Sequence, residues 1–155
     1  MRMREIKFRG KRFVGGVWEI GWYLQREGNY GETLHFIYDG EHEHLVHPET
    51  IGQYTEREKM FEGDIVRYDT TWNKTIGVVR FGDYEQDGSG GEYSGAWVKG
   101  FYVERVLIIP SEWDIEMNEP PTEREEEKTI SIITCDFEVI GNRWDHPHLL
   151  KGEEG

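Results

Sequence analysis

The chain has 155 residues, of which 36% are hydrophobic and 14% aromatic, and its formal net charge is −13. This length fits one domain, or two small ones that share a core filled by large aromatic side chains. The negative charge argues against broad contact with nucleic-acid phosphates or anionic lipid, and the longest aliphatic run, Val106–Ile109, is too short to span a bilayer. A single cysteine, Cys135, excludes an intrachain disulfide, so we expect a cytoplasmic protein without a secretory leader.

Alternation of apolar and polar residues is the dominant pattern and predicts a mostly β protein. It begins at Glu5–Arg9, where Gly10 is expected to end the strand, and the pair Gly15-Gly16 predicts a hairpin turn to the next strand. This second strand has the clearest alternation in the chain. Its predicted buried face consists of Trp18, Ile20, Trp22 and Leu24, opposite Glu19, Gly21, Tyr23 and Gln25.

Further strands are predicted in the rest of the chain, at residues 33–38, 65–68, 76–81, 96–98, 101–109 and 130–140. The turn before the first of them is Gly28–Gly31. The segment Gly82–Gly95 contains five glycines and is expected to form a long, mobile loop. Val106–Ile109 is apolar at every position and predicts the centre of a sheet, and Cys135 falls on an apolar strand face where it is expected to be buried.

Charge is distributed unevenly along the chain. Most of the charged residues among the first 26 are basic. Residues 117–128, in contrast, form a low-complexity acidic segment that is expected to be a solvated loop. Within it, Pro120-Pro121-Thr122 followed by Glu125 resembles a capping box, and a helix there would be short and exposed. Such complementary surfaces suit two ends of one molecule, or two copies of it, meeting.

Several residue blocks that span the chain in order resemble the YopX family, proteins encoded largely by bacteriophages and prophages. The blocks are Arg4–Gly10 with Trp18, Gly52–Thr55, Glu62–Val66, Glu138–Asn142 and Pro147–Leu150. The turn between the second and third blocks is shorter here than is usual in the family. The resemblance implies an SH3-like barrel over residues 60–150, packed beside an N-terminal β-rich part over residues 1–59, with a disordered tail at 151–155. It implies no catalytic or cofactor-binding residues.

The histidine-rich segment His42–His47 is the one candidate for metal chemistry. His42, His44 and His47 are metal-ligand types, but on a strand the third points away from the other two, so joint coordination needs a turn between them. His146 and His148 are expected to lie in a polar turn. The run Gly88–Gly91 lacks the lysine and hydroxyl residue of a phosphate-binding loop, and no nucleophile–base pair is recognisable.

These patterns favour a protein that binds a protein partner or itself over an enzyme. An alternative is nucleic-acid binding through the basic and aromatic N-terminal strand, with Lys7, Arg9, Lys11 and Arg12 as contacts, against which the predicted inward position of Trp18 and Trp22 argues. A related alternative is that the acidic residues near 112–127 imitate DNA and occupy a host DNA-binding site. The least favoured alternative is a metal-dependent enzyme that uses His42 and His44.

Overall fold

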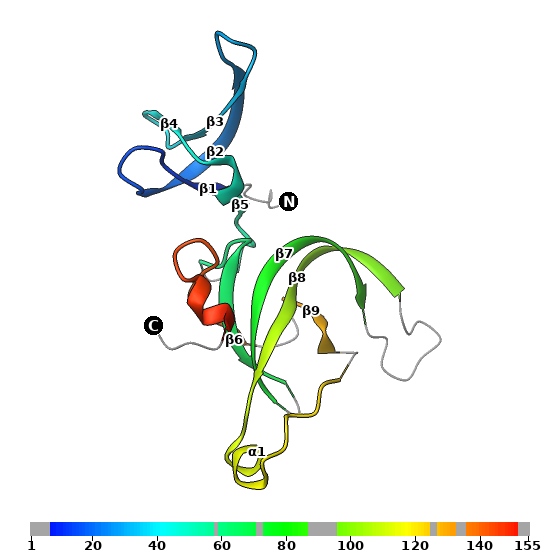
Figure 1. The fold of residues 1–155 in the computed structure, drawn as a ribbon. Helices are drawn as coiled ribbons and strands as arrows, with labels where there is room; N and C mark the ends of the chain where they lie inside the picture. Colours follow the sequence, from blue (N-terminus) through cyan, green and yellow to red (C-terminus); the bar gives the residue numbers. More distant parts are fainter. Residues whose placement is uncertain are drawn as a thin grey trace. The chain divides into compact units, whose positions relative to one another are not determined.

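The computed structural model describes residues 7–57, 59–70, 73–86, 96–124, 127–132 and 136–151 (Figure 1). The chain divides into two compact units, Met1–Phe61 and Glu62–Gly155. Each unit contains one five-stranded sheet in which all the pairings are antiparallel, so the predicted mostly β class is confirmed.

The sheet of the first unit has the strand order β4-β3-β2-β1-β5. Its strands are β1 (Phe8–Lys11), β2 (Trp18–Glu27), β3 (Thr33–Tyr38), β4 (Glu43–Leu45) and β5 (Gly52–Gln53), with a short 3-10 helix at Pro48–Thr50. The predicted hairpin turns are present: Gly15, Gly16 and Gly31 adopt the positive φ angles that glycine tolerates. The strand predicted at residues 33–38 coincides with β3.

The core of the first unit lies on one face of this sheet, around the fully buried side chains of Ile37 and Val46. Gly10 allows this packing, because a Cβ atom there would lie 2.9 Å from Cγ2 of Val46 and 3.2 Å from Cγ1 of Ile37. The expectation that Gly10 ends the first strand is wrong. β1 continues through it to Lys11, since the missing side chain makes room for the core.

The predicted buried face of β2 is also wrong. The alternation is real, but Ile20 is 48% exposed and Trp22 is 59% exposed, whereas the opposite face carries the half-buried Tyr23 and Gly21. Residues paired across strands share a face, and Tyr23 pairs with the buried Ile37. The core is therefore on the Tyr23 side, and Ile20 and Trp22 on the other face remain exposed.

The sheet of the second unit has the strand order β10-β6-β7-β8-β9. Its strands are β6 (Asp64–Asp69), β7 (Lys74–Gln86), β8 (Ala96–Ile109), β9 (Thr129–Ser131) and β10 (Glu138–Asn142), and a 3-10 helix spans Pro147–Lys151. A cluster of buried Ile65, Ile76 and Val78 is packed against half-buried apolar residues of β8, β10 and the 3-10 helix. Among the described residues the outer strands β9 and β10 do not pair, so the sheet is not closed.

Several segment boundaries in the second unit differ from the predicted ones. β7 runs to Gln86, so the expected loop at Gly82–Gly95 begins later, and its residues 87–95 lie outside the described part. The two segments predicted at 96–98 and 101–109 form the single strand β8. Val106 is 41% exposed rather than central, because among the described residues β9 pairs only with Tyr102–Glu104 of β8.

A helix that was not predicted follows β8. Helix α1 (Glu112–Met117) has Ser111 as its N-cap, and Ser111 and Asp114 form a capping box, whereas the box expected at Thr122 forms no helix in the described residues 120–124. The acidic segment 117–128 thus begins inside α1. The region predicted as one strand at 130–140 contains β9 and β10, and residues 133–135, with Cys135, lie outside the described part, as do residues 152–155.

Candidate functional site

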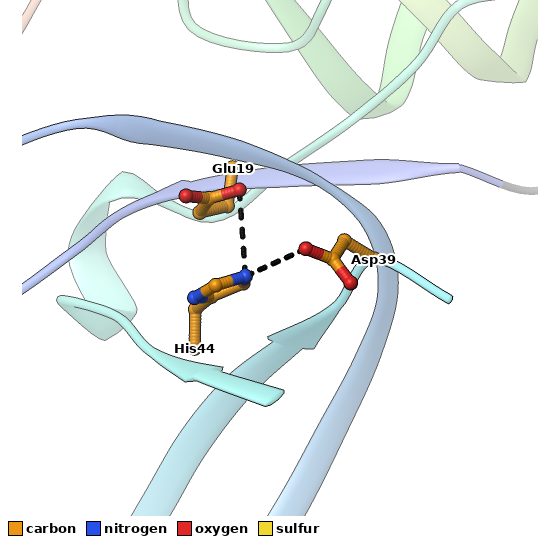
Figure 2. A group of neighbouring side chains, drawn as sticks. All are labelled: Glu19, Asp39 and His44. Atoms are coloured by element: carbon orange, nitrogen blue, oxygen red, sulfur yellow. Dashed lines mark hydrogen bonds and ion pairs between the residues drawn. The ribbon is translucent and has the colours of Figure 1, made fainter. Parts of the chain in front are cut away.

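Three metal-ligand side chains converge in the first unit (Figure 2). Glu19 lies on β2, Asp39 follows β3 and His44 lies on β4. The Nε2 atom of His44 is 2.8 Å from Oδ2 of Asp39 and 3.6 Å from Oε2 of Glu19. One nitrogen or oxygen ligand atom from each residue lies within 4.8 Å of the other two. We call these three residues the Glu19–Asp39–His44 cluster.

The backbone holds Asp39 in place for this contact. Its Oδ1 atom accepts hydrogen bonds from the backbone N–H groups of Glu41 and His42, both at 2.8 Å, as is typical of a turn-forming aspartate. The bond from His42, followed by those from the His44 side chain and the Glu41 backbone, holds the pKa of the Asp39 carboxyl well below its usual value. Asp39 is therefore ionised at neutral pH.

The ionised Asp39 determines which ring nitrogen of His44 carries a proton. A carboxylate can only accept hydrogen bonds, so Nε2 of His44 is the donor in this pair. Glu19 is also 3.7 Å from the Arg12 guanidinium, which places a cation beside its carboxylate. The cluster thus works as an ion-pair network that joins β2, β4 and the β3–β4 turn. It has the oxygen and nitrogen atoms that a divalent metal would need, once Nε2 loses its proton.

The structure does not bring the three predicted histidines together. The rings of His42 and His44 are 6.4 Å apart and edge-on. The His47 ring instead contacts Phe13 at 3.9 Å, and its Nδ1 atom is 3.6 Å from Oε1 of Glu49. Only His44 joins a group of possible metal ligands among the described residues, and its partners Glu19 and Asp39 were missed in the sequence.

His146 follows the turn after β10, whereas His148 lies in the 3-10 helix Pro147–Lys151 instead of the expected polar turn. The backbone N–H of Asn142 donates to Nδ1 of His146 at 3.2 Å, and a Cβ atom at Gly141 would lie 2.7 Å from the same nitrogen. The rings of His146 and His148 are 6.1 Å apart. His146 therefore packs against the end of the strand and supports the turn.

A second feature of the first unit is an exposed apolar surface on the sheet face opposite the core. Trp22 and Ile20 from β2 and Leu45 from β4, which is 37% exposed, lie on it. Strand pairing places half-buried apolar side chains beside them, and the Trp22 ring stacks on Tyr38 at 5.8 Å. We call this surface the Trp22 face; it consists of Ile20, Trp22, Leu24, Phe36, Tyr38 and Leu45.

Basic side chains border the Trp22 face. The Arg26 guanidinium lies 5.5 Å from the centre of the Phe36 ring and pairs with Glu43. At the other end, the Arg9 guanidinium lies between the rings of Trp18 and Phe61, at 4.8 and 4.9 Å. These contacts hold the two guanidinium groups against aromatic rings.

In the second unit, helix α1 is exposed along its whole length. Trp113, Ile115 and Met117 are 58%, 70% and 52% exposed, and no residue of the helix is buried. Glu112, Asp114 and Glu116 alternate with these apolar residues. The charge of this segment is therefore opposite to that of the basic residues that border the Trp22 face.

Comparisons of the chain with protein-family models, with curated proteins and with solved structures found no match. None of the described helices is long and apolar enough to cross a membrane. The features of the described residues that bear on function are therefore the Trp22 face, the Glu19–Asp39–His44 cluster and α1.

Proposed function

We propose that this protein acts by binding a protein partner or another copy of itself, not by catalysis, and that it does so through the Trp22 face. The observation that carries the proposal is the exposure of Ile20, Trp22 and Leu45 together on one side of a sheet whose core lies on the other side. Contiguous exposed apolar side chains on a small protein typically mark an interaction site. Tryptophan, in addition, is among the residues that contribute most to binding.

We further propose a cytoplasmic phage or prophage accessory protein of YopX type. Support comes from the residue blocks that resemble this family, which fall in both units, and two of them, Glu62–Val66 and Glu138–Asn142, lie in or beside the paired strands β6 and β10. In this proposal the second unit is an SH3-like barrel. Its five antiparallel strands and the strong bend of β7 and β8 (Figure 1) are consistent with such a barrel. Closure would require contacts between β9 and β10, and nuclear Overhauser effects between Ile130 and Val139 would test for them.

Capture of partners by immobilised protein tests the main proposal. Wild-type protein incubated with lysate of the host bacterium is expected to retain partners, or further copies of itself, that Trp22→Ala protein does not retain. Tyr30→Ala is the matched control, because Tyr30 is an aromatic residue of the same unit, 94% exposed, at the β2–β3 turn away from the Trp22 face. Equal retention by the Trp22→Ala and Tyr30→Ala variants would remove the proposal.

A second candidate function, divalent metal binding, is favoured by one observation: the convergence of Glu19, Asp39 and His44 (Figure 2). Zinc or manganese bound there would take the place of the Nε2 proton of His44, so metal binding competes with protonation and affinity should rise with pH. Titration calorimetry with each metal would detect this, and His44→Ala should abolish it. His42→Ala is the control, since His42 belongs to the same segment but not to the cluster. If neither metal binds, the cluster acts only as an ion-pair network.

A further inference from the structure

We propose that the Trp22 face of one copy binds the α1 segment of a second copy, where the α1 segment is defined as Ser111–Arg124. This inference rests on the proposed binding function and names the partner of that same surface. Both surfaces belong to described residues, and each presents a tryptophan that is more than half exposed, Trp22 and Trp113. Both surfaces are apolar, their charges are opposite, and the first turn of α1 is already formed before binding.

The apolar match involves one face of the helix. Trp113 and Met117 are four residues apart, so they lie on the same side of α1. A helix of six residues that buries none of them is marginal by itself, and packing against an apolar surface would stabilise it. The capping box of Ser111 and Asp114 already fixes its first turn, which lowers the entropy lost on binding.

The charges of the two surfaces are opposite. The sheet face that contains the Trp22 face carries three basic residues, Arg9, Lys11 and Arg26, and one acidic residue, Glu43. The α1 segment carries Arg124 and five acidic residues: Glu112, Asp114, Glu116, Glu119 and Glu123. Attraction between such surfaces steers association and is weakened by salt.

The charges of the two units argue against pairing of two α1 segments. Residues 1–61 contain 9 basic and 10 acidic residues, whereas residues 62–155 contain 9 basic and 21 acidic residues. The formal net charge of the second unit is therefore −12 and that of the first unit −1. Two acidic second units repel each other, so pairing of one α1 segment with another is disfavoured.

Contact between two different surfaces is heterologous and has a specific consequence. After a single contact one copy still has an unused α1 segment and the other an unused Trp22 face, so association continues into chains unless a ring closes. Two variants, each with one surface damaged, should therefore form a single contact when mixed. Pairing of a surface with its own copy cannot produce this rescue.

Sedimentation velocity of the full chain tests the inference. Wild-type protein is expected to associate as its concentration rises, and less so at 0.5 M than at about 0.05 M sodium chloride, because salt screens exposed charges. Trp22→Ala and Trp113→Ala should each weaken association roughly 30-fold, the effect of losing a central tryptophan. An equimolar mixture of the two variants should form a dimer that neither forms alone. Tyr30→Ala should associate like wild type.

A second variant guards against damage to the fold. Glu112→Lys with Glu116→Lys changes only exposed side chains, and it should reduce association and remove its salt dependence. Circular dichroism should show unchanged strand content for every variant.

Three results would overturn the inference. The first is a monomer at all concentrations, as expected if the surface is covered within one chain. The second is association that depends on Trp22 but not on Trp113, which would mean that the Trp22 face pairs with itself. The third is no association but Trp22-dependent binding of a single-stranded oligonucleotide, measured by gel shift. That result would leave the Trp22 face as a binding surface. If Trp22→Ala protein instead associates and retains partners as the wild type does, the proposed function is removed as well.

Discussion

Replacement of Gly21 by alanine should destabilise the first unit more than any other small substitution in β2. A Cβ atom at Gly21 would lie 2.0 Å from the carbonyl oxygen of Tyr38 and 3.2 Å from Cα of Asp39. Ordinary contact begins at 3.4 Å, so β2 and β3 must separate by about 1.4 Å at this point. Overpacking costs about 1–3 kcal/mol and each lost hydrogen bond about 1 kcal/mol. We therefore expect the free energy of unfolding to fall by about 3 kcal/mol.

The assay is urea unfolding followed by nuclear magnetic resonance, with amide signals of β2 and β3 reporting on the first unit alone. Gly31→Ala is the matched control in the same unit. Gly31 has a φ angle of +81° but nothing within 4 Å of the added Cβ, so only the left-handed backbone is penalised, by about 1–2 kcal/mol. A loss for Gly21→Ala no larger than that for Gly31→Ala would refute the close approach of β2 to Tyr38.

Three further substitutions test other local features. Gly63→Ala places a Cβ 2.2 Å from the Trp144 ring at a φ angle of +93°. The free energy of unfolding of the second unit, measured by urea unfolding, should therefore fall by about 2–4 kcal/mol. A loss below about 1 kcal/mol would contradict this. Hydrogen bonds lower the pKa of Asp39 below its ordinary value of 3.8, so their stabilisation is complete above that pH and is lost as the pH falls further. The wild-type urea midpoint should therefore fall between pH 5 and pH 2.5, and that of Asp39→Asn should fall less; parallel curves would contradict it. Ser111→Ala removes the N-cap and should melt α1, seen in the Cα chemical shift of Trp113, without changing the urea midpoint, because α1 buries no residue.

Local patterns were sufficient to locate most strands of the first unit. The strand predicted at 33–38 matches β3 because a glycine turn precedes it, Asp39-Gly40 follows it, and apolar residues alternate within it. β2 was found for the same reason, but its buried face was assigned to the wrong side. Hydropathy identifies which residues share a face, yet it does not decide which of two partly apolar faces covers the core. The pairing of Tyr23 with the buried Ile37 identifies the core side here, and hydropathy carries no information on that pairing.

The Glu19–Asp39–His44 cluster needed information about strand register. His42, His44 and His47 suggest a joint site because they lie within six residues of one another in the chain. Glu19 and Asp39, by contrast, reach His44 only through strand pairing. A usable signal was present: the hairpin centred on Gly28–Gly31 pairs Trp22 with Tyr38, which brings the residues just before Gly21 towards those just after Tyr38. Extending that register by one step would have placed Asp39 opposite Gly21, and Glu19 is the next residue of β2 on the same face. Helix α1 was missed for a different reason, since a helix that buries none of its residues leaves no apolar stripe to detect.

Stability and binding measurements on the same variant separate the two explanations of the Trp22 face. Because the core of the first unit lies around Ile37 and Val46 on the other side of the sheet, Trp22→Ala should change the free energy of unfolding by no more than about 1 kcal/mol, mostly through the lost stacking on Tyr38. Binding should nevertheless be lost. A destabilisation above about 3 kcal/mol, the size found for buried tryptophans, would mean that Trp22 packs in the interior, and the exposed face would then carry no argument for a partner. A tryptophan that contributes little to folding yet decides association is the combination that a binding surface requires.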